Sequence, residues 1–378
     1  MASLSFPTNL MMSSSDYSPL LSVQELVNKP LHSIPHQYIR DDDHHHESSS
    51  SSSSPAPIPI IDMNLLLSGD DEDHDEHTHR SESELHKLHL ACTDWGIFQL
   101  VNHGVSPEEL EELRNGIEGF FKLPLEEKMK YKIRAGEVEG YGTVIKSPNQ
   151  KLDWGDRLYM TVNPLHTRKP YLLPDLPSSL RSKLEIYIEK VQKMGMAILG
   201  LLEKAVRMEG KEMRKVFEDG LQSVRMTYYP ACPQPEKVMG FGAHSDATGI
   251  TILNQVNGVS GLQIKKDDVW LPIDVLPNAL IVNVGDILEI MSNGLYKSVE
   301  HRAKVNSNKE RISLAYFFLP KYGSEIGPAM SLLSPQNPPL FRRIAMEKYV
   351  SDFFSIKLNG KSYLEHMRIK TPNSTNTI

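Results

Sequence analysis

The sequence contains little cysteine and no long apolar run. Only two cysteines, Cys92 and Cys232, occur among 378 residues, too few for a disulfide framework. No segment approaches the roughly 18 consecutive apolar residues of a membrane span. The amino-terminal stretch lacks a basic region followed by an apolar core, so no secretory signal is predicted. We therefore expect a cytoplasmic protein, because scarce cysteine fits a reducing compartment.

Positive charge is also scarce. The formal net charge is −7, with 41 lysines and arginines scattered among 48 acidic residues. A nucleic-acid surface needs clustered basic residues, so this class of partner is not expected. We expect a monomer that contacts neither nucleic acid nor membrane.

The first 56 residues are polar and contain a run of seven serines, Ser48–Ser54. Such a segment buries too little apolar surface to offset its ordering entropy. The adjacent "DDDHHHE" (41–47) offers many ligand-type side chains but no scaffold to fix their geometry, so we predict a solvated tail. The charged stretch at 69–80 is predicted to be a loop for the same reason. By contrast, 22–39 has apolar spacing and is expected to dock on the body.

The first half of the ordered chain has mixed helical and strand signals. The predicted elements are a strand at 57–63, a helix at 83–95, a strand at 96–102 and a long helix at 179–208. Ser106 and Glu109 form a capping-box pattern with proline at the first helical position. The long helix carries a stripe expected to pack in the core: Leu184, Ile188, Val191, Met194, Ile198, Leu201 and Leu202.

After residue 220 the pattern changes to short β-rich segments separated by turn signals. The predicted strands are 223–229, 249–256, 261–265, 269–273, 279–285, 287–292, 295–303 and 311–318. Many short strands at this spacing indicate a sandwich or barrel, and a jelly roll is one such solution. A helical tail is expected from about residue 339.

The stretch "GFGAHSDATG" (240–249) places His244 and Asp246 two residues apart. In an extended segment these side chains point to the same side, and the flanking glycines allow a tight turn. His301 stands at the end of another predicted strand. Two histidines and one carboxylate with open positions form the facial triad of non-haem Fe(II) oxygenases, so these residues are candidate metal ligands.

Arg311 and Ser313 share one face of the last predicted strand. A buried arginine among apolar neighbours needs an anionic partner. Either a protein carboxylate or a dicarboxylate cosubstrate supplies that anion, and the sequence alone leaves both open.

These motifs resemble the plant 2-oxoglutarate- and Fe(II)-dependent dioxygenases, closest to the senescence-related and alkaloid O-demethylase branch. The likeness spans about 57–360. Its further motifs are "DWGIFQLVNHG" (94–104), "RMTYYPACPQP" (225–235), "GLQI" (261–264) and "NVGDILEIMSNGLYKSVEHR" (283–302). The resemblance implies an α+β fold with a double-stranded β-helix (jelly-roll) core, an N-terminal α/β region and flanking helices.

The resemblance also implies the reactants. Fe(II) would be held by His244, Asp246 and His301, with 2-oxoglutarate and O2 as cosubstrates and ascorbate in support. The far carboxylate of 2-oxoglutarate would meet Arg311, Ser313 and Tyr229. Thr227 stands where family members commonly have a cosubstrate-binding asparagine, and it keeps a hydroxyl on a shorter side chain.

Four segments are expected: a lead without fixed structure (1–56), an N-terminal dioxygenase region (57–215), the Fe(II)/2-oxoglutarate jelly roll (216–325) and a C-terminal extension (326–378). The expected reaction is hydroxylation or oxidative O-demethylation of a hydrophobic plant metabolite, such as a methoxylated flavonoid, alkaloid or terpenoid, with release of succinate and CO2.

Several alternatives stay open. A plant hormone is the alternative substrate. A non-catalytic binding protein on this scaffold and a zinc hydrolase are the alternative functions. Tyr141 and Phe317 are candidate substrate-pocket residues, because ligand cavities are commonly lined by aromatic side chains, although Phe317 fits core packing equally well.

Overall fold

The computed structural model describes residues 22–29, 31, 33–40, 55–68, 75–145, 150–208, 212–355 and 360–370. The "DDDHHHE" cluster at 41–47 and the serine run at 48–54 lie outside the described residues, as do positions 69–74 of the charged stretch.

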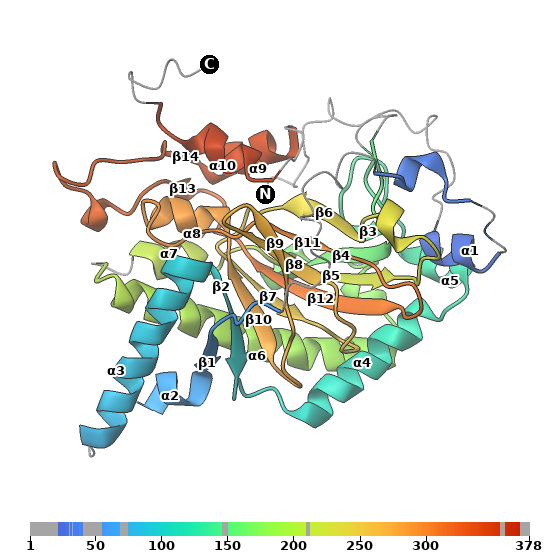
Figure 1. Ribbon diagram of the computed structural model, residues 1–378, viewed down its shortest axis with the longest axis horizontal. Coiled ribbons are helices and arrows are strands. Elements are labelled where there is room, and N and C mark those ends of the chain that lie inside the picture. Colours follow the sequence, from blue (N-terminus) through green and yellow to red (C-terminus); the bar gives the residue numbers. More distant parts are fainter. Residues whose placement is uncertain are drawn as a thin grey trace.

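Two antiparallel-rich sheets form the centre of the molecule (Figure 1). The order of the large sheet is β1-β2-β10-β7-β12-β5-β4-β3, and that of the small sheet is β6-β11-β8-β9. The strands of the large sheet are Ile60–Asp62 (β1), Ile97–Val101 (β2), Gly140–Tyr141 (β3), Asp156–Asn163 (β4), Gln222–Tyr229 (β5), Ile250–Asn254 (β7), Leu280–Val284 (β10) and Arg311–Phe318 (β12). Those of the small sheet are Phe241–His244 (β6), Leu262–Lys266 (β8), Val269–Pro272 (β9) and His301–Ala303 (β11).

The inner strands of the large sheet are joined by long antiparallel ladders. β12 pairs with β5 over eight residues, from Arg311 opposite Tyr229 to Phe318 opposite Gln222. β12 also pairs with β7, and β10 pairs with β7. Together with the small sheet these four strands make the jelly-roll core. The expected α+β class with a jelly-roll core is therefore confirmed. Four strands from the N-terminal half, β1 to β4, extend the same large sheet at its two edges.

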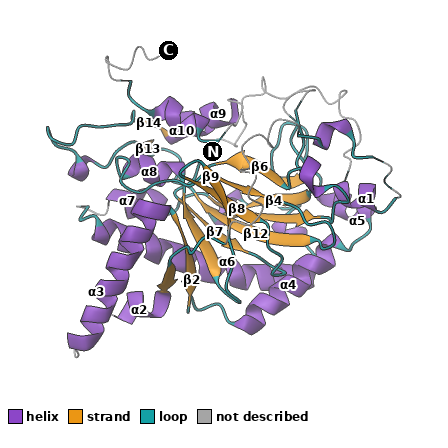
Figure 2. Cartoon of the chain, viewed as in Figure 1, coloured by secondary structure: helices purple, strands orange, loops and turns teal. Residues whose placement is uncertain are grey.

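Helices cover the large sheet on one side, as Figure 2 shows. The predicted capping box is confirmed, since Ser106 caps α4 (Pro107–Phe121) and Glu109 bonds back to its amide. The long helix α6 (Ser178–Ala205) buries the predicted stripe, with Leu201 only partly buried. Gly195 of α6 lies directly over Phe318, because an added Cβ would come within 2.1 Å of that ring. Helix and sheet therefore approach more closely than any larger side chain permits.

The amino-terminal segment docks on the body, as its apolar spacing predicted. Ser22 caps the short helix α1 (Val23–Val27), and the buried carboxylate of Asp156 accepts hydrogen bonds from the Ser22 hydroxyl and the Val23 amide. Farther along, Tyr38 packs edge-on against Trp154, with ring centroids 5.3 Å apart. This segment, residues 22–40, is called the strap below.

One predicted strand is a helix. The stretch 287–292 falls in α8 (Asp286–Met291), and every residue of α8 is buried. A helix of six residues is too short to show a clear helical period, so its apolar residues alone resemble those of a buried strand. In the predicted strand 295–303 only His301–Ala303 has strand structure.

The remaining differences lie at element boundaries. Helix α3 begins at Asp75, so part of the predicted loop 69–80 is helical, because extending an existing helix costs little. The C-terminal helices are Met346–Ser355 (α9) and Ser362–Met367 (α10), and the residues just before them include the short strand Ile344–Ala345 (β14), which pairs with Glu325–Ile326 (β13). No helix within the described ranges is long and apolar enough to cross a membrane.

Candidate active site

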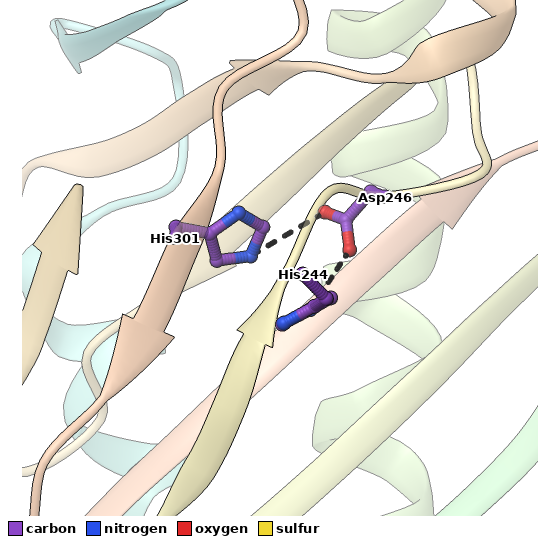
Figure 3. A group of neighbouring side chains, drawn as sticks. All are labelled: His244, Asp246 and His301. Atoms are coloured by element: carbon purple, nitrogen blue, oxygen red, sulfur yellow. Dashed lines mark ion pairs between the residues drawn. The ribbon is translucent and has the colours of Figure 1, made fainter. Parts of the chain in front are cut away.

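Two neighbouring strands and one loop bring together His244, Asp246 and His301 (Figure 3). His244 is the last residue of β6 and pairs directly with His301, the first residue of β11. Their ring centroids are 4.3 Å apart. Asp246 follows in the turn that leaves β6. His244 and His301, 57 positions apart in sequence, therefore meet because β6 ends where its antiparallel partner β11 begins.

The three side chains have the geometry of a metal site. One ligand atom from each lies within 4.8 Å of the others. The Nε2 atom of His244 is 3.4 Å from Oδ1 of Asp246, and that of His301 is 3.9 Å from Oδ2.

Backbone carbonyls set the orientation of both imidazoles. Nδ1 of His244 is 2.8 Å from the Gly242 oxygen, and Nδ1 of His301 is 3.1 Å from the Val299 oxygen. Because a carbonyl oxygen only accepts, each Nδ1 carries the proton and each Nε2 keeps its lone pair. Nε2 of His244 is buried and has no hydrogen-bond partner. An unpartnered buried acceptor beside a carboxylate fits a divalent cation, and this ligand set suits Fe(II).

Two further residues hold the Asp246 carboxylate. The hydroxyl of Thr251 donates to its Oδ2 at 2.7 Å, and the amide of Asn283 donates to the same oxygen at 2.9 Å. Burial raises the pKa of Asp246, but His301, His244 and Asn283 outweigh burial and hold the pKa well below its usual range. Burial and the neighbouring His244 lower the pKa of His301 to about 4. At neutral pH the site is therefore a carboxylate with a neutral His301 imidazole.

Thr251 and Asn283 were not identified from the sequence. They lie on β7 and β10, and Asn283 is directly opposite Thr251 across the sheet. Their approach to Asp246 depends on strand order, which no local pattern encodes. The only sequence signal for Asn283 was that it begins the family-like stretch 283–302.

These residues line one cavity. The candidate site residues that line it are Tyr229, His244, Asp246, His301, Arg311, Ser313 and Phe317. Arg225 and Phe241 complete one wall, and the guanidinium of Arg225 lies 4.3 Å from the ring centroid of Phe241 and 5.2 Å from that of Phe317. The cavity thus joins the metal-type cluster to an aromatic wall that carries the guanidinium of Arg225.

Arg311 is 2% exposed, and among the described residues no carboxylate pairs with it. Its Nε is buried without a hydrogen-bond partner, and its guanidinium lies 5.1 Å from the Tyr229 ring centroid. Gly261 leaves it room, because a Cβ there would lie 2.9 Å from Cδ of Arg311. Of the two expected partners, a protein carboxylate is therefore not found in the described part of the chain, and the arginine is available to an anionic ligand.

Tyr141 and Thr227 have other positions than the sequence suggested. Tyr141 does not line the cavity. It is buried in the core, and its hydroxyl donates to Asp156 at 3.0 Å. Thr227 is directly opposite Ser313 in the ladder but is not among the cavity residues.

Two family models match the sequence. The 2OG-Fe(II) oxygenase superfamily matches residues 220–320, and the N-terminal region named for a non-haem dioxygenase in morphine synthesis matches 58–177. Codeine O-demethylase of Papaver somniferum is 52% identical over 288 residues, covering 76% of this chain and 80% of the relative. The chain belongs to the 2OG-Fe(II) oxygenase superfamily.

A second relative and a solved structure support the same family assignment. Oxoglutarate-dependent flavonoid 7-O-demethylase 1 of Ocimum basilicum is 48% identical, covering 76% of this chain and 78% of the relative. The crystal structure of JOX2 in complex with 2OG, Fe and JA superposes with a TM-score of 0.80 at 35% identity, covering 93% of this chain and 99% of that one. The protein is therefore a 2-oxoglutarate-dependent dioxygenase that uses Fe(II), 2-oxoglutarate and O2, and the zinc-hydrolase and non-catalytic alternatives are set aside.

Proposed function

We propose that His244, Asp246 and His301 hold the iron, that Arg311, Ser313 and Tyr229 hold the far carboxylate of 2-oxoglutarate, and that the enzyme oxidises a hydrophobic plant metabolite. The observation that carries the proposal is the single cavity that joins the three ligand-type side chains to a buried arginine without an acidic partner among the described residues. A bound dicarboxylate would meet the metal at one end and the Arg311 guanidinium at the other.

When bound, Fe(II) and 2-oxoglutarate supply the oxidant from O2, with release of succinate and CO2. The protein contributes geometry and a dry site. The carbonyls of Gly242 and Val299 keep both imidazoles aimed at one point. Arg311 offers a charged fork that matches a carboxylate, and Ser313 adds a hydroxyl on the same strand face. The burial of His244, Asp246, Arg311 and Ser313 limits access of water to the reacting centre.

The proposed substrate is a methoxylated aromatic metabolite of the flavonoid or alkaloid type, oxidised at an O-methyl carbon or by hydroxylation. The aromatic wall of Phe241 and Phe317 supports a flat apolar ligand. The named relatives demethylate codeine and a flavonoid, which points in the same direction. Hydroxylation of an O-methyl carbon gives a hemiacetal, which collapses to the free hydroxyl compound and formaldehyde.

A plant hormone is the second candidate. Arg225 places a cation in the cavity, which suits a substrate with a carboxylate, and the superposed JOX2 structure is titled as a complex with JA. We further propose a monomeric cytoplasmic enzyme, because both cysteines are free and buried. Within it, residues 216–325 supply the proposed iron and cosubstrate ligands, while 57–215, 326–378 and the lead 1–56 flank them.

The test is a panel of methoxylated flavonoids, alkaloids and carboxylic-acid hormones, incubated with enzyme, Fe(II) and 2-oxoglutarate. Succinate and formaldehyde are measured together. Equimolar succinate and formaldehyde with one methoxylated compound supports demethylation, and succinate without formaldehyde supports hydroxylation. Preferential turnover of the acids favours the hormone. Full 2-oxoglutarate turnover by an Asp246→Ala variant would overturn the proposed ligand set.

A further inference from the structure

We infer that Arg40 of the strap is a positioning residue for the proposed iron ligand His244, acting through Asp153 and Gly242. The inference rests on the proposed role of His244. Arg40 lies outside both segments matched by the family models, which begin at residue 58.

The first link joins the strap to the loop before β4. Nη2 of Arg40 donates to Oδ1 of Asp153 at 2.7 Å, with the two side chains 20% and 30% exposed. The backbone fixes this end of the strap as well. The amide of Arg40 donates to the Lys237 oxygen at 3.0 Å, and the amide of Leu152 donates to the Gln37 oxygen at 2.8 Å. The strap therefore contacts the 151–154 loop and the approach to β6 at once.

The second link joins Asp153 to β6. The same Oδ1 accepts a hydrogen bond of 3.0 Å from the Gly242 amide. The Arg40 guanidinium also packs against Gly242, because an added Cβ would lie 2.9 Å from Nη1. Glycine has more backbone freedom than any other residue, so its orientation here depends on such external contacts.

The third link reaches the proposed ligand. The carbonyl of Gly242 accepts the Nδ1 proton of His244 at 2.8 Å, which sets the tautomer and the direction of the buried Nε2. Loss of a partner that orients a metal-bound histidine commonly lowers metal affinity or activity by about 10- to 100-fold. Arg40 acts on the imidazole indirectly. It orients Asp153, Asp153 accepts a hydrogen bond from the Gly242 amide, and the Gly242 carbonyl orients the His244 ring.

The experiment measures iron binding, not turnover. Fe(II) is titrated anaerobically in the presence of 2-oxoglutarate, and the visible charge-transfer absorption of the complex is recorded. That absorption requires both groups on one ion, so it reports the complex of Fe(II) with 2-oxoglutarate. We expect Arg40→Ala and Asp153→Ala each to raise the iron dissociation constant about tenfold, the lower end for such partners. The double variant should have the same iron dissociation constant as the more strongly affected single variant, because both substitutions break the same chain of contacts.

Three variants separate positioning from general stability. Arg40→Lys keeps a cation in reach of Asp153 and should recover most of the affinity. Gly242→Ala displaces the guanidinium and should weaken iron binding like Arg40→Ala. Ser22→Ala is the matched control, because it loosens the far end of the strap at Asp156 and should lower the melting temperature without changing the iron dissociation constant.

The outcomes are distinct. An iron dissociation constant that Arg40→Ala leaves unchanged, or that Ser22→Ala raises equally, would show that the strap only stabilises the fold and would overturn the inference. His244→Ala is the reference. If this variant binds iron normally, the proposed ligand set fails. If it loses iron while Arg40→Ala does not, only the positioning role fails.

Discussion

The side-chain amide of Asn283 donates a hydrogen bond of 2.9 Å to Oδ2 of Asp246, from the middle of the large sheet to the turn after β6. Thr251 donates to the same oxygen from the next strand. The carboxylate is thus oriented by two strands that themselves carry no proposed ligand. This arrangement makes the sheet, and not only the turn, a determinant of metal affinity.

Replacing Asn283 with alanine removes one of these donors. We expect the iron dissociation constant to rise by about 10- to 100-fold, since partners that orient a metal ligand matter to this extent. Titration of Fe(II) with 2-oxoglutarate present measures it. Asn163→Ala is the control, because Asn163 is also buried and hydrogen-bonded, to Gln222 and Tyr316, away from the site. Equal effects of the two substitutions on iron binding would contradict the proposed role.

Arg311→Lys tests the cosubstrate assignment. A lysine keeps the charge but cannot form the two parallel hydrogen bonds of a guanidinium. We expect the KM for 2-oxoglutarate to rise by about 10- to 100-fold, the equivalent of roughly 1.5–3 kcal/mol for hydrogen bonds to a charged group. Iron affinity without cosubstrate should be unchanged. Arg168→Lys serves as control, because Arg168 already pairs with Glu185. An unaltered KM in Arg311→Lys would remove Arg311 from the cosubstrate site.

Phe317 and Phe318 provide a matched pair on opposite faces of β12. Phe317 lines the cavity, whereas Phe318 packs in the core beneath Gly195. We expect Phe317→Leu to change the order of preferred substrates across a metabolite panel while the KM for 2-oxoglutarate stays constant. Phe318→Leu should lower the free energy of unfolding by about 1 kcal/mol without changing that order. The same substrate order in both variants would assign Phe317 to packing alone.

The stability of the protein should fall in mild acid because of His103. Its Nε2 lies 2.8 Å from the Asn278 oxygen, and its Nδ1 accepts from the Val105 amide, so the folded state holds a neutral ring. Burial lowers the pKa of His103, despite the hydrogen bond to Asn278. The unfolded chain then binds a proton more readily, so stability is full above about pH 6.5 and declines below it.

One such group contributes at most about 1.4 kcal/mol per pH unit. His103→Gln should therefore flatten the decline of the melting temperature between pH 6.5 and pH 5, measured on protein without metal. His301 also has a lowered pKa, so some slope should remain. A slope identical to that of the unaltered protein would exclude His103 as a source.

The local patterns predicted much of this structure. The capping box at Ser106 and the apolar stripe of α6 follow from spacing along one helix, and the proximity of His244 and Asp246 follows from the two-residue period of an extended chain. Their meeting with His301 required the strand order, which the family resemblance supplied. Asn283 and Thr251 were not predicted because their hydrogen bonds to Asp246 come from other strands.

Other differences between the expected and the observed positions have different physical origins. Segment 287–292 was predicted as a strand because α8 has only six residues, too few to show a helical period, and is buried throughout. Tyr141 was assigned to the substrate pocket as an aromatic residue in a family-like stretch. Its hydroxyl instead serves the buried Asp156, whose other donors come from Ser22 and Val23, more than a hundred residues away. No local pattern reports a contact of that range.

The pairing of β2 with β10 has a consequence for synthesis of the chain. Leu100 lies opposite Leu280, and Ile97 lies opposite Asn283. As the ribosome extends the chain, β2 emerges long before its antiparallel partner exists, and its apolar side chains stay unpaired while roughly half of the chain is translated. The early helices α4 and α6 can form in the meantime, but the sheet beneath them closes only when β10 and β12 have left the tunnel. We therefore expect nascent chains that end before residue 284 to depend on chaperones.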